Sequence, residues 1–167
     1  MSTGITTFSG QNLGANNLGR VKDGFKKGTI AVLTFSIVML PVMYIFGESI
    51  VGIFVNDATV IATGAKALRI TSVAYFALGM VYVPRAVLNG CGDSKFALIN
   101  GITEVLCRIG FSQLLLRIPA LGCWIIWMTN AFTWTVTGIV CVLRYKKGAW
   151  KHISLAKKLS GNKALAK

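Results

Sequence analysis

Glu104 and Arg108 are the residues whose types and spacing could do chemistry. They are four residues apart in the apolar stretch 96–116, and the acid comes first, which favours an ion pair on one helix face. A charge at membrane depth costs about 2.5 to 3.5 kcal/mol on insertion scales, so such groups pair or face water. Two interpretations stay open. The pair is structural and neutralises itself inside a bundle, or it faces a water-filled cavity with Glu104 as a proton or cation site.

A second set of candidates lies in the apolar stretch 70–88. Arg85 could line a substrate or cation pathway together with Tyr75 and Tyr82. The alternative for Arg85 is a side chain that extends to the cytoplasmic surface, with its charge in water and its stem in the apolar region. The alternative for the tyrosines is packing or contact with the membrane interface.

Hydrolytic and metal chemistry find no support in the sequence. It contains no Ser/His/Asp set, no H-E-x-x-H and no paired carboxylates, and the only histidine, His152, lies in a basic tail. No two of the four cysteines have the C-x-x-C spacing of zinc or redox sites. We therefore expect neither an enzyme nor a bound metal or cofactor.

Four long apolar stretches must position these residues, at 29–46, 70–88, 96–116 and 121–143. Stretches of about 18 or more apolar residues are typical of transmembrane helices. Charged residues make up only 14% of the chain, against about 25% in soluble domains. The sequence predicts an all-α, polytopic membrane bundle of about four transmembrane helices, preceded by the end of another helix.

The basic residues fall mostly in alternate gaps between these stretches, which indicates sidedness. The N-terminal segment, the 85–95 loop and the C-terminal tail are expected in the cytoplasm, and residues 47–69 and 117–122 outside. The net charge of +13 would suggest nucleic acid in a soluble protein. Here it follows loop topology, so the expected partner is the lipid bilayer with its anionic headgroups, and no nucleic acid.

Two glycine-containing segments are expected in cytoplasmic loops. Gly10, Gln11 and Gly14 lie where the pattern of the first helix breaks, and the two glycines suit close helix packing at a membrane surface better than phosphate binding. Gly90 and Gly92 with Asp93 predict a tight turn that allows a close helix hairpin. At the outer side, Asp57 is expected to cap the following helix.

Four motifs in this order resemble the C-terminal half of multidrug and toxic compound extrusion (MATE) transporters of the NorM-like type. They are G-Q-N-L-G-A at 10–15, L-N-G-C-G-D-S-K at 88–95, E-V-L-C-R at 104–108 and Y-K-K-G-A-W at 145–150. The resemblance extends to about residue 151. It implies a cell-membrane protein that exchanges small cationic or aromatic drugs for Na⁺ or H⁺ by alternating access.

The resemblance also implies a division of the chain. Residues 1–28 would be the end of the eighth helix and a cytoplasmic loop, 29–145 the membrane helices of a partial C-lobe in a twelve-helix fold, and 146–167 a basic cytoplasmic tail. The first lobe would be missing, so we expect a C-terminal fragment that is inactive alone. The second stretch lacks the aspartate of the Na⁺-coupled branch, which argues against a Na⁺ site of that kind.

Three other functions are weighed against this one. A lipid-precursor flippase of related fold would need a more cationic cavity, and Arg85 and Arg108 are too few to decide. A small four-helix membrane scaffold would form homogeneous oligomers from this chain alone. A membrane enzyme would need the catalytic set that the sequence lacks.

Overall fold

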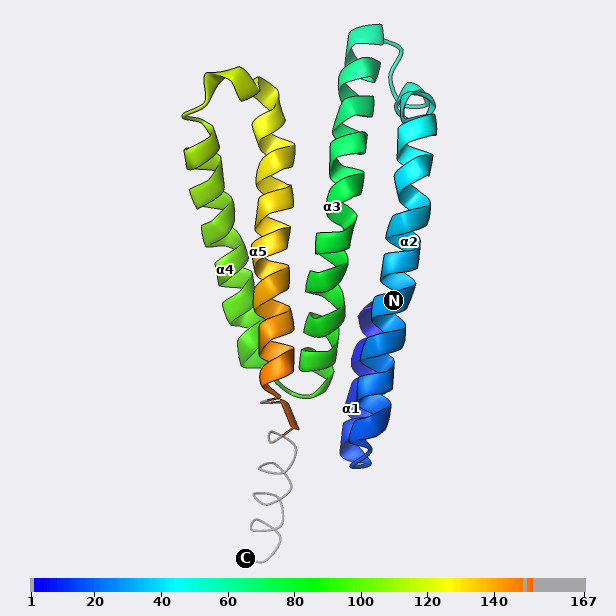
Figure 1. Cartoon of the computed structure of the whole chain (residues 1–167), viewed down its shortest axis with the longest axis vertical. Coiled ribbons are helices and arrows are strands. Elements are labelled where there is room, and N and C mark those ends of the chain that lie inside the picture. Colours follow the sequence, from blue (N-terminus) through cyan, green and yellow to red (C-terminus); the bar gives the residue numbers. More distant parts are fainter. Residues whose placement is uncertain (1, 149, 152–167) are drawn as a thin grey trace, which may run out of the picture.

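The computed structural model of the chain describes residues 2–148 and 150–151, and its regular elements are all helical (Figure 1). In chain order they are α1 (Ser2–Gly14), α2 (Leu18–Gly52), α3 (Ala58–Gly90), α4 (Ser94–Leu115), the 3₁₀ helix η1 (Pro119–Trp124) and α5 (Ile125–Lys147). The predicted all-α membrane bundle is confirmed. Most of the predicted tail, from His152 onward, lies outside the described residues.

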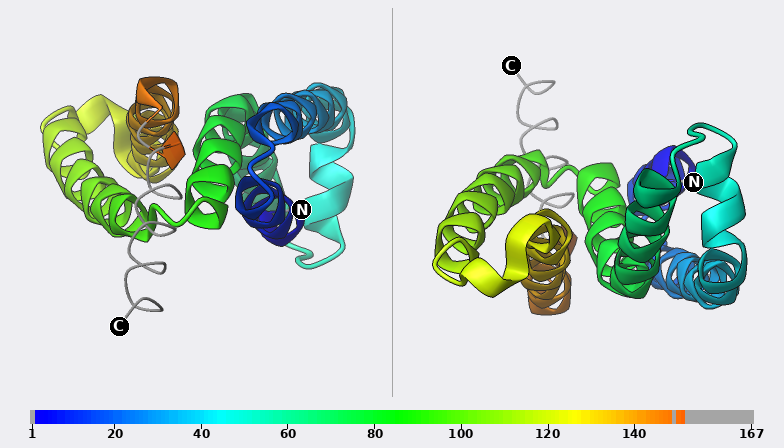
Figure 2. Two further views of the ribbon diagram at one scale, coloured as in Figure 1. Left: turned by 90° about the horizontal axis from the view of Figure 1, so that it is seen from below. Right: turned by 90° about the horizontal axis from the view of Figure 1, so that it is seen from above.

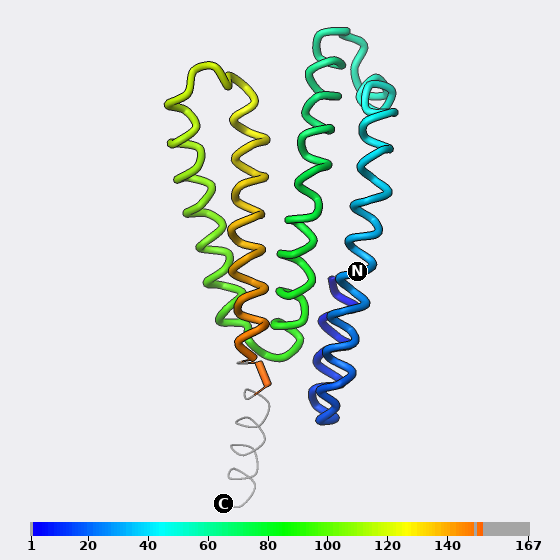
Figure 3. The backbone as a smooth tube through the Cα atoms, viewed as in Figure 1, coloured from blue at the N-terminus to red at the C-terminus, as the bar shows by residue number. Residues whose placement is uncertain are grey.

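The helices run up and down in two pairs (Figures 1 and 3). α2 packs on α3, α4 packs on α5, and α3 and α5 join the two pairs. α1 lies against the lower halves of α2 and α3 (Figure 1). The end-on views in Figure 2 show α3 between the α2 side and the α5 side. The expected close hairpin of the second and third stretches is therefore wrong, because α4 turns away from α3 and packs chiefly on α5.

Among the described residues, three segments are long and apolar enough to cross a membrane: α2, α3 and Pro119–Lys147. The fourth predicted span corresponds to the 22-residue α4. Its mean hydropathy is below that of the other three segments, because Asn100, Glu104 and Arg108 interrupt its apolar residues. At 1.5 Å per residue α4 still measures about 33 Å, close to the roughly 30 Å of a hydrocarbon core. Its polar residues need protein or water beside them, so we expect functional residues on α4.

The helices extend further than the apolar stretches. The break expected at Gly10–Gly14 and the loop up to residue 28 are wrong, because α1 continues to Gly14 and α2 begins at Leu18. Asn17 caps α2 and accepts a hydrogen bond from the Arg20 backbone N–H at 3.4 Å. α2 has 35 residues, or about 52 Å, so its basic first turns project beyond the membrane core.

The connection between α2 and α3 is also short. Residues 47–69 were expected as an interfacial stretch with a turn, and only 53–57 lie outside the two helices. The predicted cap is confirmed, since Asp57 Oδ1 accepts from the backbone N–H groups of Thr59 and Val60 at 2.8 and 3.0 Å. We call this end of the bundle, with η1, the outer end, after the sidedness that the sequence predicts. The opposite end, with the α1–α2 loop, the α3–α4 turn and Lys147, is the basic end.

Large apolar side chains cover much of the bundle surface. Ile45, Leu98 and Leu106 are each more than 60% exposed, and similar residues occur on all four long helices. A soluble monomer rarely exposes such a continuous apolar surface, whereas lipid solvates it. The described part of the chain is therefore a multi-pass membrane structure.

α1 joins the bundle through direct backbone contact with α3. A Cβ atom added at Gly10 would lie 2.9 Å from the Gly90 carbonyl oxygen, and one added at Gly90 would meet the Thr6 carbonyl oxygen. The Thr6 hydroxyl donates to the Ala86 carbonyl at 3.1 Å. Small residues allow this approach between membrane helices. Gly14, by contrast, has nothing within 4 Å of an added Cβ.

Gly90→Ala is expected to destabilise the fold by about 1 to 3 kcal/mol, because the added methyl group must push α1 away from α3. Thermal unfolding of the purified protein in detergent measures the effect. Gly110→Ala is the matched control, since Gly110 lies in α4 with open space around an added Cβ, and alanine there should stabilise the helix by roughly 0.5 to 1 kcal/mol. Equal melting temperatures for the two variants would contradict the close contact.

Candidate functional site

The structure brings three of the candidate residues together at one ion-pair group. Glu104 and Arg108 pair within α4, with Oε1 to Nη2 at 3.3 Å, and Arg85 of α3 approaches the other carboxylate oxygen, with Nη1 to Oε2 at 3.8 Å. We call Arg85, Glu104 and Arg108 the α3–α4 charge group. Its formal net charge is positive, because two guanidinium groups share one carboxylate.

The charge group is half-open rather than buried. The exposed fractions of the side chains are 30% for Arg85, 27% for Glu104 and 52% for Arg108. Charges with this exposure at membrane depth need water or another protein surface, because lipid would not solvate them. The group therefore faces either water or another protein surface.

Arg85 reaches α4 beside Gly101. A Cβ added at Gly101, one turn before Glu104, would lie 3.8 Å from Arg85 Nη2. Arg85 and Gly101 also line a shallow groove on α4 together with Ala97 and Val105. The sequence offered Arg85 as a pathway residue and did not identify Glu104 as its partner. The only signal was the shared polarity of two residues in neighbouring apolar stretches.

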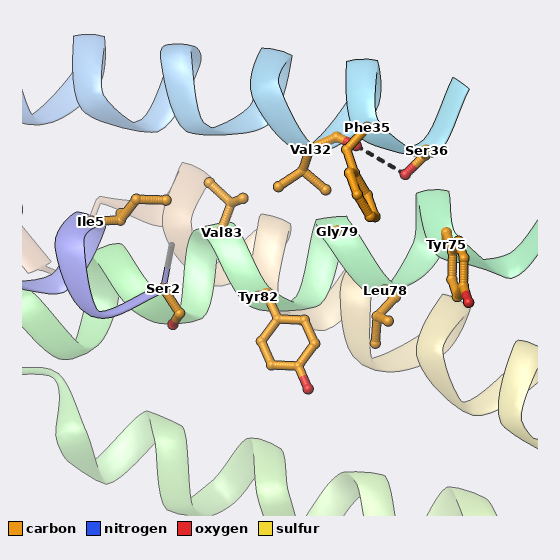
Figure 4. A pocket seen from close by; sticks show the side chains of 10 residues that line it. All are labelled: Ser2, Ile5, Val32, Phe35, Ser36, Tyr75, Leu78, Gly79, Tyr82 and Val83. Atoms are coloured by element: carbon orange, nitrogen blue, oxygen red, sulfur yellow. Dashed lines mark hydrogen bonds between the residues drawn. The ribbon is translucent and has the colours of Figure 1, made fainter. Parts of the chain in front are cut away.

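Tyr75 and Tyr82 lie in a different place, in an apolar pocket between α1, α2 and α3 (Figure 4). The pocket holds about 250 Å³, and its lining contains neither Arg85 nor Glu104. Figure 4 shows Tyr82 pointing away from α2, while Val32 and Phe35 enter from the α2 side. The candidate residues therefore form two groups, the α3–α4 charge group and an aromatic pair on α3.

Asp93 has a structural partner that sequence reasoning missed. Its carboxylate Oδ2 accepts from Arg144 Nε at 2.9 Å, and its side chain is only 5% exposed. The Arg144 guanidinium also lies over the Phe96 ring at 5.5 Å. The turn that was predicted at Gly90, Gly92 and Asp93 is present, with Gly92 in the left-handed region at φ 88°. This ion pair joins the turn to the end of α5.

Aromatic stacking closes the same end of the bundle. The rings of Phe25 in α2 and Tyr145 in α5 stack at 3.9 Å, and Tyr145 stacks on Trp150 at 5.6 Å. The Trp150 indole donates to the Tyr145 carbonyl at 3.1 Å. Beside them, burial raises the pKa of the Cys91 thiol to about 12, with a smaller contribution from Asp93, so the thiol is protonated at neutral pH. The basic end is thus tightly packed, while the charge group is open.

Gln11, the remaining candidate residue, lies exposed on α1. Within residues 2–148 and 150–151, no group of three or more His, Cys, Asp or Glu residues could hold a metal ion. The charge group and the aromatic pocket are the features that the candidate residues form.

The chain was compared with known protein families, curated proteins and solved structures. A family model described as MatE matches residues 1–114, which include the aromatic pair, Asp93 and the whole charge group. No curated protein matches the chain. No solved structure matches it either.

Proposed function

The chain belongs to the MatE family, whose members are transporters and not enzymes, and from this premise we propose that it serves secondary active multidrug efflux. In this proposal a drug leaves the cell in exchange for Na⁺ or H⁺. The observation that carries it is the α3–α4 charge group. In this group Glu104, the only acidic residue near the middle of a membrane helix, lies between two arginines.

Glu104 is the proposed coupling residue. Ionisable groups inside membranes commonly mark ion pathways and proton relays. When Glu104 is ionised, it holds Arg85 and Arg108 and thereby ties α3 to α4. When a cation or proton neutralises it, that attraction ends. A change in one charge can in this way bias the relative position of two helices.

The aromatic pocket is the proposed contact for small cationic or aromatic drugs. Tyr75, Tyr82 and Phe35 offer ring faces, which attract both aromatic rings and cations. The pocket is almost wholly apolar apart from hydroxyl groups such as that of Ser36. It lies apart from Glu104, so the drug and the coupling ion would act at separate places on α3 and α4.

A second set of membrane helices is proposed to complete the transporter. Transport sites normally form between two structural repeats, and the exposed fractions of Glu104 and Arg108 leave one side of the charge group for such a partner. We call this chain together with those helices the assembled transporter. It is proposed to reside in the cell membrane with the basic end of this chain in the cytoplasm, because that end carries residues such as Lys26, Lys27 and Lys147.

Dye accumulation in cells tests the proposal. Cells that make the assembled transporter should accumulate several-fold less ethidium, an aromatic cation, than cells without it, and a protonophore combined with Na⁺ removal should erase the difference. This chain produced alone should give no difference. Unchanged accumulation by a well-expressed assembled transporter would overturn the proposal, and full efflux by this chain alone would overturn the need for a second lobe.

A further inference from the structure

A groove between α1 and α2 at the basic end has no role in the proposed function. Its volume is about 490 Å³, against about 250 Å³ for the aromatic pocket. Figure 1 shows α1 lying along the lower part of α2, where this groove runs. Its lining combines the charged side chains of Arg20, Asp23 and Lys27 with glycines and with apolar side chains such as those of Ile5 and Phe8. We call it the α1–α2 groove.

Two glycines of α2 let α1 pack closely beside the groove. A Cβ atom added at Gly24 would lie 2.7 Å from Cε1 of Phe8, and one added at Gly28 would lie 2.8 Å from Cδ1 of Ile5. Gly24 and Gly28 are four residues apart, so they lie on the same face of α2. The apolar part of the groove is therefore formed by α1 side chains that rest on the α2 backbone.

The two cations of the groove come from α2. Arg20 and Lys27 are seven residues apart, about two helical turns, so both lie on one face of the helix. The Arg20 guanidinium carbon lies 5.9 Å from the centre of the Phe8 ring. Within residues 2–148 and 150–151, neither cation takes part in an ion pair. Because Asp23 also lines the groove, the lining keeps a single net positive charge.

The groove crosses the level at which the membrane core begins. The apolar stretch of α2 starts at residue 29, and the groove extends from Arg20 on one side of that level to Ala31 on the other. Lys27 lies about 3 Å before the start of the stretch, within a headgroup layer of about 5 to 8 Å. The cations are thus placed at the lipid headgroups, and the apolar side chains beside Ala31 are placed at the first carbons of the acyl chains.

We propose that the α1–α2 groove binds one anionic phospholipid from the leaflet at the basic end. The phosphate lies between Arg20 and Lys27, and the acyl chains run past Ile5 and Ala31 toward the bilayer core. The single net positive charge of the lining matches the single negative charge of a headgroup such as that of phosphatidylglycerol. An acidic peptide or a soluble polyanion would contact the cations but would leave the apolar half of the groove uncovered.

Native mass spectrometry of the purified chain in detergent tests the site, because it counts bound lipid molecules and gives their Kd. We expect one phosphatidylglycerol to bind per chain, and phosphatidylcholine with the same acyl chains to bind about tenfold more weakly. Arg20→Gln combined with Lys27→Gln should weaken phosphatidylglycerol binding roughly 10- to 30-fold, since each cation near a membrane surface contributes about fivefold. Unchanged binding in this double variant would overturn the proposal.

Lys22→Gln combined with Lys26→Gln is the matched control. These two lysines are exposed in the same turns of α2, but their spacing places them on the face opposite Arg20 and Lys27. The control removes the same charge from the chain, and it should leave the Kd for phosphatidylglycerol within about twofold of the wild type. Equal losses in the two double variants would mean a general attraction to the basic end and would overturn the specific site.

Two single variants test the charged and the apolar halves of the groove separately. Asp23→Asn removes the anion from the lining and should tighten phosphatidylglycerol binding about fivefold. Gly4→Leu adds an apolar side chain to the groove at a position where an added Cβ has open space, and it should weaken the binding severalfold with every charge retained. An unchanged Kd in Gly4→Leu would show that the acyl chains lie elsewhere and would overturn the proposal.

Inorganic phosphate distinguishes a lipid site from a simple anion site. At millimolar concentration it should leave phosphatidylglycerol bound, because it lacks the acyl chains that occupy the apolar half of the groove. Displacement of the lipid by phosphate would overturn the proposal. None of these measurements needs transport, so a failure of the proposed efflux function would leave the lipid site standing.

Discussion

Glu104→Gln is expected to reduce ion-driven drug export roughly 100-fold while the protein remains present at normal levels, a loss of the size seen when a proton-transfer group is removed. Glutamine keeps the shape and the hydrogen-bonding oxygen of glutamate but can neither bind a proton nor neutralise a cation. Arg85 and Arg108 are then left without an anion, as in the proposed neutralised state of Glu104. The helices α3 and α4 therefore cannot return to the arrangement that the ionised carboxylate holds. Export of ethidium from cells and protein abundance in the membrane are measured together.

The same experiment decides between the two interpretations of the charge group. A purely structural ion pair would show its loss as low abundance, with normal export per molecule that survives. Glu48→Gln is a matched control, because Glu48 pairs with Arg69 at the same 3.3 Å as Glu104 with Arg108 but lies exposed near the outer end. Surface pairs contribute about 0 to 1 kcal/mol, so this variant should export and accumulate normally.

Arg144→Ala is expected to lower the free energy of unfolding by about 3 kcal/mol, or roughly 6 to 12 °C in Tm for a chain of this size. The reason is that Asp93, with its side chain 5% exposed, would keep a buried negative charge without a partner. The α3–α4 turn would lose its attachment to α5, and the Phe96 ring would lose the guanidinium above it. Thermal unfolding in detergent gives the value.

A double-mutant cycle assigns the loss to the ion pair. Arg144→Gln combined with Asp93→Asn should be more stable than Arg144→Gln alone, because the double variant leaves no buried charge. Arg69→Ala is the exposed counterpart and should cost less than about 1 kcal/mol. If Arg144→Ala melts with the wild type, Asp93 and Arg144 do not form the joint described here.

Local features of the fold were predictable from the sequence, while the partners of most polar residues were not. The apolar stretches located the membrane helices, and Asp57 before an apolar run indicated a helix cap, because both signals act within a few residues. The extent of α2 was missed because its first turns carry Arg20, Lys22 and Lys27. Charges there suggested a loop, although a helix that projects from the membrane tolerates them equally well.

The candidate site shows the same limit. Glu104 and Arg108 could be paired from spacing alone, since a helix places residues four apart on one face. The partners of Arg85 and Arg144 could be identified only from the structure, because those contacts depend on which helices are neighbours and on their register. Asn100 was not identified from the sequence as a residue of interest. An asparagine in an apolar helix indicates a special environment only when its burial and its lack of hydrogen-bond partners are known.

The most direct test of the account is drug uptake into proteoliposomes that contain the assembled transporter, driven by an imposed gradient of one ion at a time. We expect ethidium movement under a pH gradient or under a Na⁺ gradient at equal pH, according to which ion is coupled, and none in either case for Glu104→Gln. Equal pH-driven movement in the wild type and in Glu104→Gln would contradict the central claim that this carboxylate couples ion and drug.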